Sequence, residues 1–564
     1  MSNTTNQNFS DLTRRDFLGA GVAAGAVAGV GLGAFKLGYD KAMGSPVRVG
    51  VIGTGDEGSV LIGALSPSFI EVRSISDIRP FNQFRAFHGD QGVSVRPGLM
   101  SIYGWKTESE AKRHVKVYGP YEELLANAKR DGIEAIIIGL PLHLHAAVSI
   151  AAMNQGLHVL TEKLMGQTVH ECKEMARVAE KTRRYLSIGH QRHYNILYWE
   201  AMDKIQRGVL GDIHSIRAQW HRSNLPGRDS WQMPLPPGVK KENATTKLID
   251  DYNKCKVKLA ASYGKEWEKE SKRLAQFEAQ LADQVLNQKG DDGKIVAESL
   301  GYLPAKITDP SGKVYDRPAL EELIRWRLFD RTGAGMMAEL GSHQLDAASI
   351  FISAMHGKKQ HPLRVVAAAN RPVFGGDRDI EDHVYCIVDF PAPGFNHEDP
   401  KTHRKKIVVQ YSSINGNGYL GYGELVFGTK GTLALEREQD LKIIKGLGDD
   451  ESGETSVSMS AGGGGPTMDT QSSGPARKAG GAGGGPVSRG YKEELEHWAW
   501  CIRHPSPENK PRCHPVVAMA DAVIALTANM SAEQGKPIEF KEEWFDPNKD
   551  ETPEGVAPDI NRYS

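Results

Sequence analysis

Short apolar runs alternate with amphipathic stretches from residue 47 to about residue 190. The run at 133–140 is almost continuously apolar, as expected for a parallel strand that is covered on both faces. Further strands are predicted at 47–52, 70–76, 158–161 and 185–189, and helices at 121–130, 144–155 and 169–182. Strands and helices that alternate at this spacing predict a doubly wound parallel sheet of the α/β class.

After about residue 210 the pattern changes to stretches in which polar and apolar residues partly alternate. No helical pattern separates the later stretches, so they favour an antiparallel sheet. The stretches cover 213–222, 364–369, 383–390, 406–412 and 424–436, and a glycine turn at 427–431 divides the last of them.

Two insertions interrupt this second region. Residues 240–290 are rich in charge and carry apolar side chains at helical spacing, such as Leu274, Phe277 and Leu281, so we expect a long helix or a helical hairpin. Residues 446–488 are dominated by Gly, Ser and Pro, which predicts a disordered loop.

The N-terminal pattern is that of an export signal. Arg14 and Arg15 stand in Thr-Arg-Arg-Asp-Phe-Leu, and an apolar stretch rich in Gly and Ala follows at 19–35. We therefore expect a twin-arginine signal within residues 1–45, recognition by the twin-arginine translocation machinery, and a periplasmic or otherwise exported protein. An uncleaved membrane anchor is the alternative, because the segment has no clean Ala-x-Ala cleavage site.

Composition narrows the choice of partners and of site types. The 564 residues include 69 Lys and Arg against 70 Asp and Glu, so no basic excess indicates nucleic-acid binding. The five cysteines include no Cys-x-x-Cys pair, and His143 and His145 have no third ligand near them in the sequence. The sequence therefore predicts neither a metal site nor a disulfide framework.

A glycine motif, Gly53-Thr54-Gly55-Asp-Glu57-Gly58, follows the first predicted strand. Glycines between a strand and a helix let a pyrophosphate approach the backbone N–H groups at the helix N-terminus. Asp77 ends the second strand, where a carboxylate binds ribose hydroxyls and favours NAD over NADP. Arg79 keeps NADP as an alternative cofactor, and a plain glycine turn beside a surface aspartate is the alternative to a nucleotide site.

Together with three later motifs, this pattern resembles the Gfo/Idh/MocA oxidoreductase family, which includes glucose–fructose oxidoreductase and inositol dehydrogenases. The later motifs are Leu140-Pro141-Leu-His-Leu-His145, Thr161-Glu162-Lys163-Leu164 and Glu339-Leu-Gly-Ser-His343-Gln-Leu-Asp346. They are similar to the family's Pro-x-x-x-His, Glu-Lys-Pro and Asp-x-Gly-x-His-x-x-Asp. The resemblance runs from about residue 47 to residue 540, apart from the two insertions.

The resemblance implies two domains and a homo-oligomer. An N-terminal Rossmann domain is expected at 46–165, and a second α/β domain with a large, mostly antiparallel open sheet at 166–545, before a tail at 546–564. The open face of that sheet is expected to join the subunits. The cofactor is expected to lie against residues of the motifs: Gly53, Thr54, Gly55, Glu57, Gly58, Asp77, Arg79, Leu140, Pro141, His145, Glu162 and Lys163.

The resemblance also implies the catalytic residues. Lys163 would lie beside the nicotinamide, and His343 would be the general acid or base for the substrate hydroxyl, a role that suits histidine. Glu339, one helical turn before His343, is expected to help position it. The sequence has Leu164 where the family has proline, and Glu339 where it has the shorter aspartate.

The expected substrate contacts lie around the same site. They are Lys163, Arg192, Trp220 and Asp346. Arg192 follows the carboxyl end of a predicted strand, where ligand sites of α/β sheets cluster. Trp220 offers an aromatic face to a sugar, and a tryptophan that only packs its strand is the alternative.

An export signal beside a nicotinamide site predicts a cofactor that leaves the cytoplasm with the folded protein and is reused. We expect an exported NAD(P)-dependent oxidoreductase that transfers hydride between a sugar or polyol hydroxyl and a tightly held nicotinamide. The alternatives are an NAD-dependent glycosidase or epimerase that uses transient oxidation, and a non-catalytic exported sugar-binding protein on the same fold.

Overall fold

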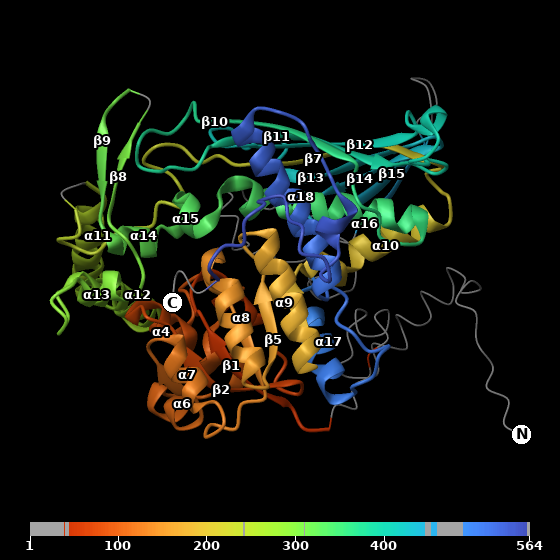
Figure 1. Cartoon of the computed structure of the whole chain (residues 1–564). Coiled ribbons are helices and arrows are strands. Elements are labelled where there is room, and N and C mark those ends of the chain that lie inside the picture. The colour runs from red at the N-terminus through yellow and green to blue at the C-terminus, as the bar shows by residue number, and fades with distance from the viewer. Residues whose placement is uncertain are drawn as a thin grey trace, which may run out of the picture.

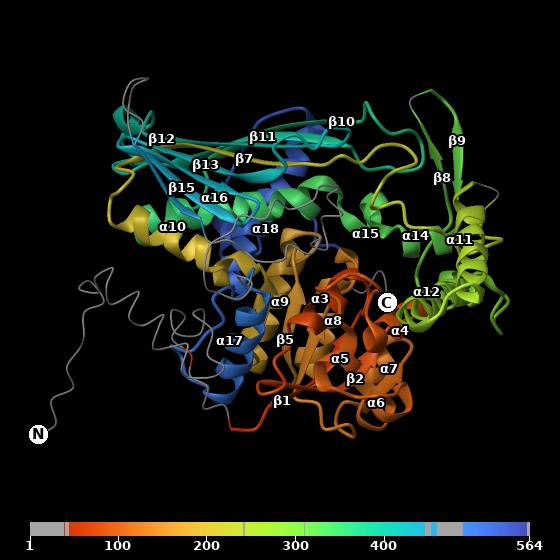
Figure 2. The ribbon, with the colours of Figure 1, turned by 180° about the vertical axis from the view of Figure 1, so that it is seen from behind.

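A computed structural model describes residues 39, 44–240, 243–309, 311–445, 453–458 and 489–560. The expected twin-arginine signal and its alternative, a membrane anchor, lie outside these residues, apart from Tyr39 and the last two residues of the segment. The described chain forms a lower parallel-sheet domain, an upper sheet domain with helices between the two, and a helical insertion at one side (Figures 1 and 2).

The first domain is built on a six-stranded parallel sheet in the order β3-β2-β1-β4-β5-β6. Its strands are β1 (Val47–Ile52), β2 (Ile70–Ser76), β3 (Lys116–Tyr118), β4 (Ala135–Ile138), β5 (His158–Glu162) and β6 (Leu186–Gly189). The order reverses between β1 and β4, and open α/β sheets bind ligands at the carboxyl ends of the strands at such a point. The predicted doubly wound sheet is confirmed.

Helices cover both faces of this sheet, so every residue of β4 is buried. The helices are α3 (Asp56–Ala64), α4 (Pro80–His88), α5 (Gly98–Tyr103), α6 (Glu108–His114), α7 (Tyr121–Asn127), α8 (His145–Asn154) and α9 (Val169–Thr182). Strand β6 follows α9 and forms the edge of the sheet beside β5, so the parallel sheet extends to Gly189. The late helix α17 (Tyr491–Arg503) packs through Leu495 and Trp498 onto the face that α3 covers.

The second domain has a nine-stranded sheet in the order β16-β15-β14-β13-β7-β12-β11-β10-β17. All neighbours are antiparallel except β7 and β12, which confirms the predicted large, mostly antiparallel sheet. The strands are β7 (Ile213–His221), β10 (Arg364–Asn370), β11 (His383–Pro391), β12 (Lys406–Ile414), β13 (Tyr422–Gly428), β14 (Gly431–Glu436), β15 (Asp440–Lys445), β16 (Gly453–Ser458) and β17 (Ile538–Glu539).

Strand β16 lies inside the stretch 446–488, for which the sequence predicted a loop. Its Thr455 and Val457 are β-branched residues, which favour strands, and they pair with Ile443 and Leu441 of β15. The rest of the predicted loop lies outside the described residues.

Three helices lie between the nine-stranded sheet and the first domain: α10 (Ile196–Gln206), α16 (Ser342–His356) and α18 (Pro515–Gln534) (Figure 1). Among the described residues, α18 alone is long and apolar enough to cross a membrane, but 67% of its most apolar window is buried, as in a core helix. Shorter helical turns are η5 (Trp326–Leu328), η7 (Pro400–Thr402) and η8 (Glu542–Phe545).

The insertion contains the expected helical hairpin, formed by α11 (Asn243–Ala260) and α12 (Gly264–Ala282). It continues well past residue 290 through η4 (Asp283–Asn287), α13 (Val296–Ser299), the hairpin of β8 (Ala305–Thr308) and β9 (Val314–Arg317), α14 (Ala319–Ile324) and α15 (Asp330–Gly333). Helix α12 packs against α4 of the first domain, so the insertion reaches back over the ends of the parallel strands (Figure 2).

Candidate active site

A cavity of about 730 Å³ lies at the carboxyl ends of β1, β2, β4 and β5. This volume is within the range of small-molecule and cofactor sites. The first domain contributes the glycine loop, the ends of β2 and β5, the loop after β4 and the segment 119–123. The remaining walls come from residues 230, 231, 233, 292, 294, 298–302, 323–327 and 339. The insertion and the second domain therefore close a site that the Rossmann sheet opens.

The glycine turn between β1 and α3 accepts no side chain at two positions. Gly53 has a φ of +81°, and a Cβ there would lie 2.5 Å from the carbonyl oxygen of Gly139. A Cβ on Gly58 would lie 1.9 Å from the carbonyl oxygen of Gly53. This close packing holds the N-terminus of α3 at the cavity, where its N–H groups suit a phosphate. The residues present thus fit a dinucleotide.

Asp77 lies at the end of β2 and lines the same cavity. Its Oδ2 accepts a hydrogen bond of 2.8 Å from the Thr54 N–H, and its Oδ1 accepts one of 2.9 Å from the Arg79 N–H. Burial raises the pKa of Asp77, although these N–H donors oppose the shift. The carboxylate is therefore held in one orientation at the place expected for the ribose contact.

Lys163 follows β5, and its side chain is 7% exposed. Its Nζ donates a hydrogen bond of 2.6 Å to the carbonyl oxygen of Glu339 and lies 3.5 Å from Oε2 of the same residue. Oε1 of Glu339 accepts a hydrogen bond of 2.7 Å from Arg327, whose guanidinium is also 3.6 Å from Asp56. The four residues line the cavity and connect the glycine loop to the catalytic lysine position.

Asp56 and Arg327 were not among the predicted site residues. Burial alone would raise the pKa of Asp56, but the charges of Arg85, Arg96 and Arg327 hold it below its usual range. Asp56 stands inside the glycine motif, so its position in the sequence already indicated that it lies near the site. Arg327 lies far away in the sequence, and only folding brings it to the motif.

His145 connects two loops at the base of the site. Its Nδ1 is 2.8 Å from the carbonyl oxygen of Leu164 and its Nε2 is 2.9 Å from that of Leu140. The peptide bond between Lys163 and Leu164, where the family has Lys-Pro, is cis. Of the predicted cofactor residues, those that line the cavity are Gly53, Gly55, Glu57, Asp77, Arg79, Leu140, Pro141, Glu162 and Lys163, whereas Thr54, Gly58 and His145 support them from behind.

His343 lies at the start of α16 but is not part of the cavity wall. Its side chain is buried, and its ring centroid is 5.4 Å from that of Trp220. Glu339 belongs to a π-helical turn, η6 (Met337–Gly341), in place of the expected α-helical one. The extra residue in a π turn rotates Glu339 relative to His343, so the carboxylate faces Lys163 and Arg327.

The other predicted substrate residues lie in the same buried layer as His343. Arg192 donates to the carbonyl oxygen of His343 at 2.6 Å and is held between Glu424 at 3.3 Å and Glu438 at 2.8 Å. Trp220 and Asp346 are also buried, and none of the three lines the cavity. Lys163 and Glu339 are thus the predicted catalytic residues that the structure brings to the cavity.

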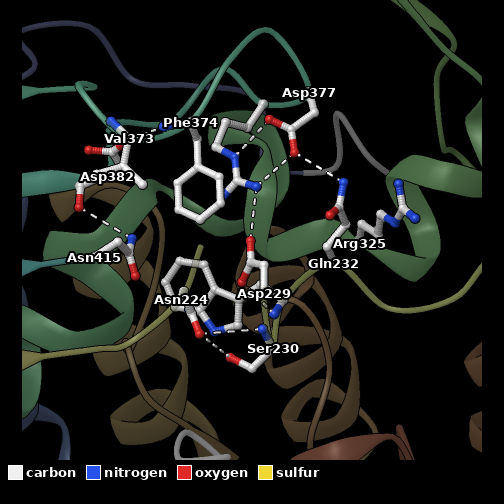
Figure 3. A network of polar contacts seen from close by, with 12 residues as sticks. Asn224, Asp229, Ser230, Gln232, Arg325, Val373, Phe374, Asp377, Asp382 and Asn415 are labelled. Atoms are coloured by element: carbon white, nitrogen blue, oxygen red, sulfur yellow. Dashed lines mark hydrogen bonds and ion pairs between the residues drawn. The ribbon is translucent and has the colours of Figure 1, made fainter. Parts of the chain in front are cut away.

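A polar network in the second domain holds the cavity wall at 230–233 (Figure 3). Arg378 pairs with Asp229 at 2.9 Å and with Asp377 at 2.7 Å, and Gln232 donates to Asp377 at 3.2 Å. Arg325 donates to the carbonyl oxygen of Met233 at 2.8 Å. No motif in the sequence indicated this network, because its members come from three separate segments.

Comparison with known families agrees with this geometry. Residues 47–190 match the Gfo/Idh/MocA profile, which is described as "Oxidoreductase family, NAD-binding Rossmann fold". An uncharacterized oxidoreductase of Schizosaccharomyces pombe is 33% identical over 155 residues, which cover 26% of this chain and 41% of that protein.

Two further relatives have more specific names. Inositol 2-dehydrogenase 1 of Saccharopolyspora erythraea is 27% identical over 169 residues, covering 29% of this chain and 43% of that protein. A glycosyl hydrolase family 109 protein of Solibacter usitatus is 24% identical over 208 residues, covering 36% and 44%. The chain thus spans less than half the length of each of the three relatives.

Solved structures share the whole two-domain fold. Levoglucosan dehydrogenase in complex with NADH and L-sorbose aligns at a TM-score of 0.50 and 14% identity, covering 88% of this chain and 99% of that one. An NAD binding oxidoreductase from Klebsiella pneumoniae aligns at 0.51 and 15%, covering 88% and 100%. The profile match, the glycine turn and Asp77 lead to one conclusion: residues 47–190 form an NAD-binding Rossmann domain that is similar to that of the Gfo/Idh/MocA oxidoreductase family.

Proposed function

We propose that this protein is an exported, NAD-dependent oxidoreductase that acts on a hydroxyl group of a sugar or polyol and keeps its cofactor bound. The observation that carries the proposal is one cavity with the glycine turn and Asp77 at one end and Lys163 at the other. Two of the similar proteins are named as dehydrogenases of inositol and levoglucosan, which supports a polyhydroxylated substrate.

The residues of the cavity suit alcohol oxidation. When bound, a nicotinamide supplies the hydride acceptor. The Lys163 ammonium donates a hydrogen bond to the substrate hydroxyl and stabilises the negative charge that grows on its oxygen as the proton leaves. Glu339 and Arg327 hold the ammonium in place. Glu339 and His343 are the two proposed proton acceptors. The variants Glu339→Gln and His343→Asn distinguish them, because replacement of the true acceptor is expected to abolish turnover while the cofactor stays bound.

The contacts that the insertion makes with the first domain support retention of the cofactor. Asp283 is 1% exposed, pairs with the Arg79 guanidinium at 2.8 Å and accepts the Phe81 N–H at 3.0 Å. Beyond this contact, Lys294 and Tyr302 of the insertion line the same cavity as Asp77. The nucleotide end is therefore closed by a second segment of chain. Because Arg79 is already paired with Asp283, it is less available to a 2′-phosphate, which favours NAD over NADP.

Export with a resident cofactor explains the presence of an export pattern and a nucleotide site in one chain. The twin-arginine route carries folded proteins, and all five cysteines are buried without a disulfide, as in a protein that folds in a reducing compartment. A cofactor carried in this way is reused when a second carbonyl compound takes the hydride, or when the hydride returns to the same substrate.

A redox-neutral glycosidase is the second candidate, because one relative is named as a glycosyl hydrolase family 109 protein. Transient oxidation of a sugar hydroxyl acidifies the neighbouring C–H bond, so that the glycosidic bond is eliminated before the hydride returns. The same Lys163 position serves this chemistry.

The decisive experiment uses the full chain, purified without added nucleotide. We expect nicotinamide in its absorbance and mass spectra, and turnover of members of a sugar and glycoside panel without added NAD. Release of the aglycone without a change in oxidation state would identify the glycosidase. Protein that contains no nicotinamide and needs added NAD for every turnover would contradict cofactor retention but not the oxidoreductase.

We further propose that the open face of the nine-stranded sheet joins subunits. Strand β11 buries Val384 and Cys386 but exposes Tyr385 at 41% and Ile387 at 45% on that face. Light scattering on the full chain is expected to show a homo-oligomer whose mass falls in Ile387→Lys. Val257→Lys, which changes a 73% exposed residue on the insertion, is the matched control. Equal masses for the wild type and Ile387→Lys would contradict this interface.

A further inference from the structure

A cluster of histidine and aspartate side chains lies behind the cavity, at the carboxyl end of β6. His193 of η3 (Gln191–Tyr194), Asp346 of α16 and Asp521 of α18 place one ligand atom each within 4.8 Å of one another. Nε2 of His193 is 2.8 Å from Oδ1 of Asp346. None of these residues lines the cofactor cavity, and the sequence separates them widely.

A fourth side chain points into this cluster. The side chain of His190 is fully buried, and its Nδ1 is 3.4 Å from Oδ2 of Asp346. Its Nε2 makes no hydrogen bond within the part of the chain that the structure describes. A buried polar atom without a partner destabilises a fold, so this imidazole requires a further partner.

The buried carboxyl groups of the cluster also favour a bound cation. Asp346 and Asp521 are both fully buried. Lys359 pairs with one of them, since its Nζ is 2.7 Å from Oδ1 of Asp521. A buried charge is costly unless it has a partner, and a divalent ion bound between these carboxylates and the imidazoles would supply one.

We propose that His193, Asp346 and Asp521, with His190 as a fourth ligand, bind one divalent metal ion. Imidazole nitrogens and carboxylate oxygens are ligands of Zn²⁺ and of similar ions, and four of them complete a closed structural site. The side chain of His193 is 15% exposed, which gives an ion a way in.

The proposed ion has a positioning role. Asp346 lies on α16, one turn after His343, and His190 directly follows β6. Asp521 belongs to α18, which packs against both α16 and β6. An ion at this junction would fix the start of α16, and with it His343, against the parallel sheet. The site does not depend on the proposed oxidoreductase activity.

The test is the metal content of the full chain, purified without chelators and measured by mass spectrometry of the elements. We expect about one divalent ion per chain, predominantly zinc. Removal of the ion with a chelator is expected to lower the melting temperature by several degrees, and added Zn²⁺ is expected to restore it.

Variants separate the metal from general damage to the fold. Asp521→Asn and His193→Ala are expected to lose the ion, whereas Asp229→Asn, which changes a buried carboxylate paired with Arg378, is expected to keep it. The nicotinamide content of the same samples reports the cofactor site independently. Protein that contains no metal, and whose melting temperature does not change with chelator, Zn²⁺ or Mn²⁺, would overturn the proposal and leave a hydrogen-bonded ion-pair network in its place.

Discussion

Replacement of Lys163 by methionine is expected to reduce kcat about a thousandfold while the cofactor stays bound. Methionine keeps most of the methylene packing of a side chain that is 7% exposed, but it removes the ammonium group. Turnover is lost because, within the described residues, no other cation on the cavity wall is held by Glu339 in the way that Lys163 is. Arg327 does not replace it, since its guanidinium is shared between Glu339 and Asp56. Steady-state kinetics on the panel substrate and nicotinamide content measure the two effects separately.

The control for this prediction is Lys181→Met, an exposed lysine in the last turn of α9. It removes one positive charge far from the cavity and is expected to leave kcat unchanged. If Lys163→Met kept full turnover, the catalytic role of this lysine would be wrong, and an exported sugar-binding protein on a retained fold would become the better explanation.

Replacement of Asp283 by alanine is expected to speed the release of NAD about 10- to 100-fold. The variant removes the partner of the Arg79 guanidinium and the acceptor of the Phe81 N–H, so the insertion loses its buried polar contact with the first domain. It also frees Arg79 beside the ribose site, so the preference for NAD over NADP is expected to fall. Dissociation rates followed by nicotinamide fluorescence, with both cofactors, measure the change.

Two further variants make this result specific. Asp283→Asn removes the charge but keeps an oxygen that can accept the Phe81 N–H, and its effect is expected to be intermediate. Asp250→Ala changes an exposed carboxylate on α11 of the same insertion and is expected to release NAD at the wild-type rate. Equal release rates for Asp283→Ala and the wild type would show that the insertion does not retain the cofactor.

Most of the fold was predictable because it depends on local periodicity. The strands of the parallel sheet read as short apolar runs, since both faces of β4 are covered, and the second sheet reads as alternation, since β11 buries only one side. The strand predicted at 185–189 pairs with β5 as β6, at the edge of the parallel sheet.

The candidate site was predictable only in part. The motif positions around Gly53, Asp77 and Lys163 reach the cavity because each follows the carboxyl end of a parallel strand. The place of His343 was not predictable, because the π-helical turn before α16 separates its direction from that of Glu339.

The fold class, the glycine turn and the positions of Asp77 and Lys163 were predictable because they depend on residues close together along the chain. The distant groups that complete the site become known only once the chain is folded. Arg327 reaches Asp56 and Glu339, Asp283 reaches Arg79, and Asp521 reaches Lys359, across separations that no local pattern encodes. The physical reason is that a buried charge requires a partner of opposite charge, and the packing of domains and insertion chooses that partner.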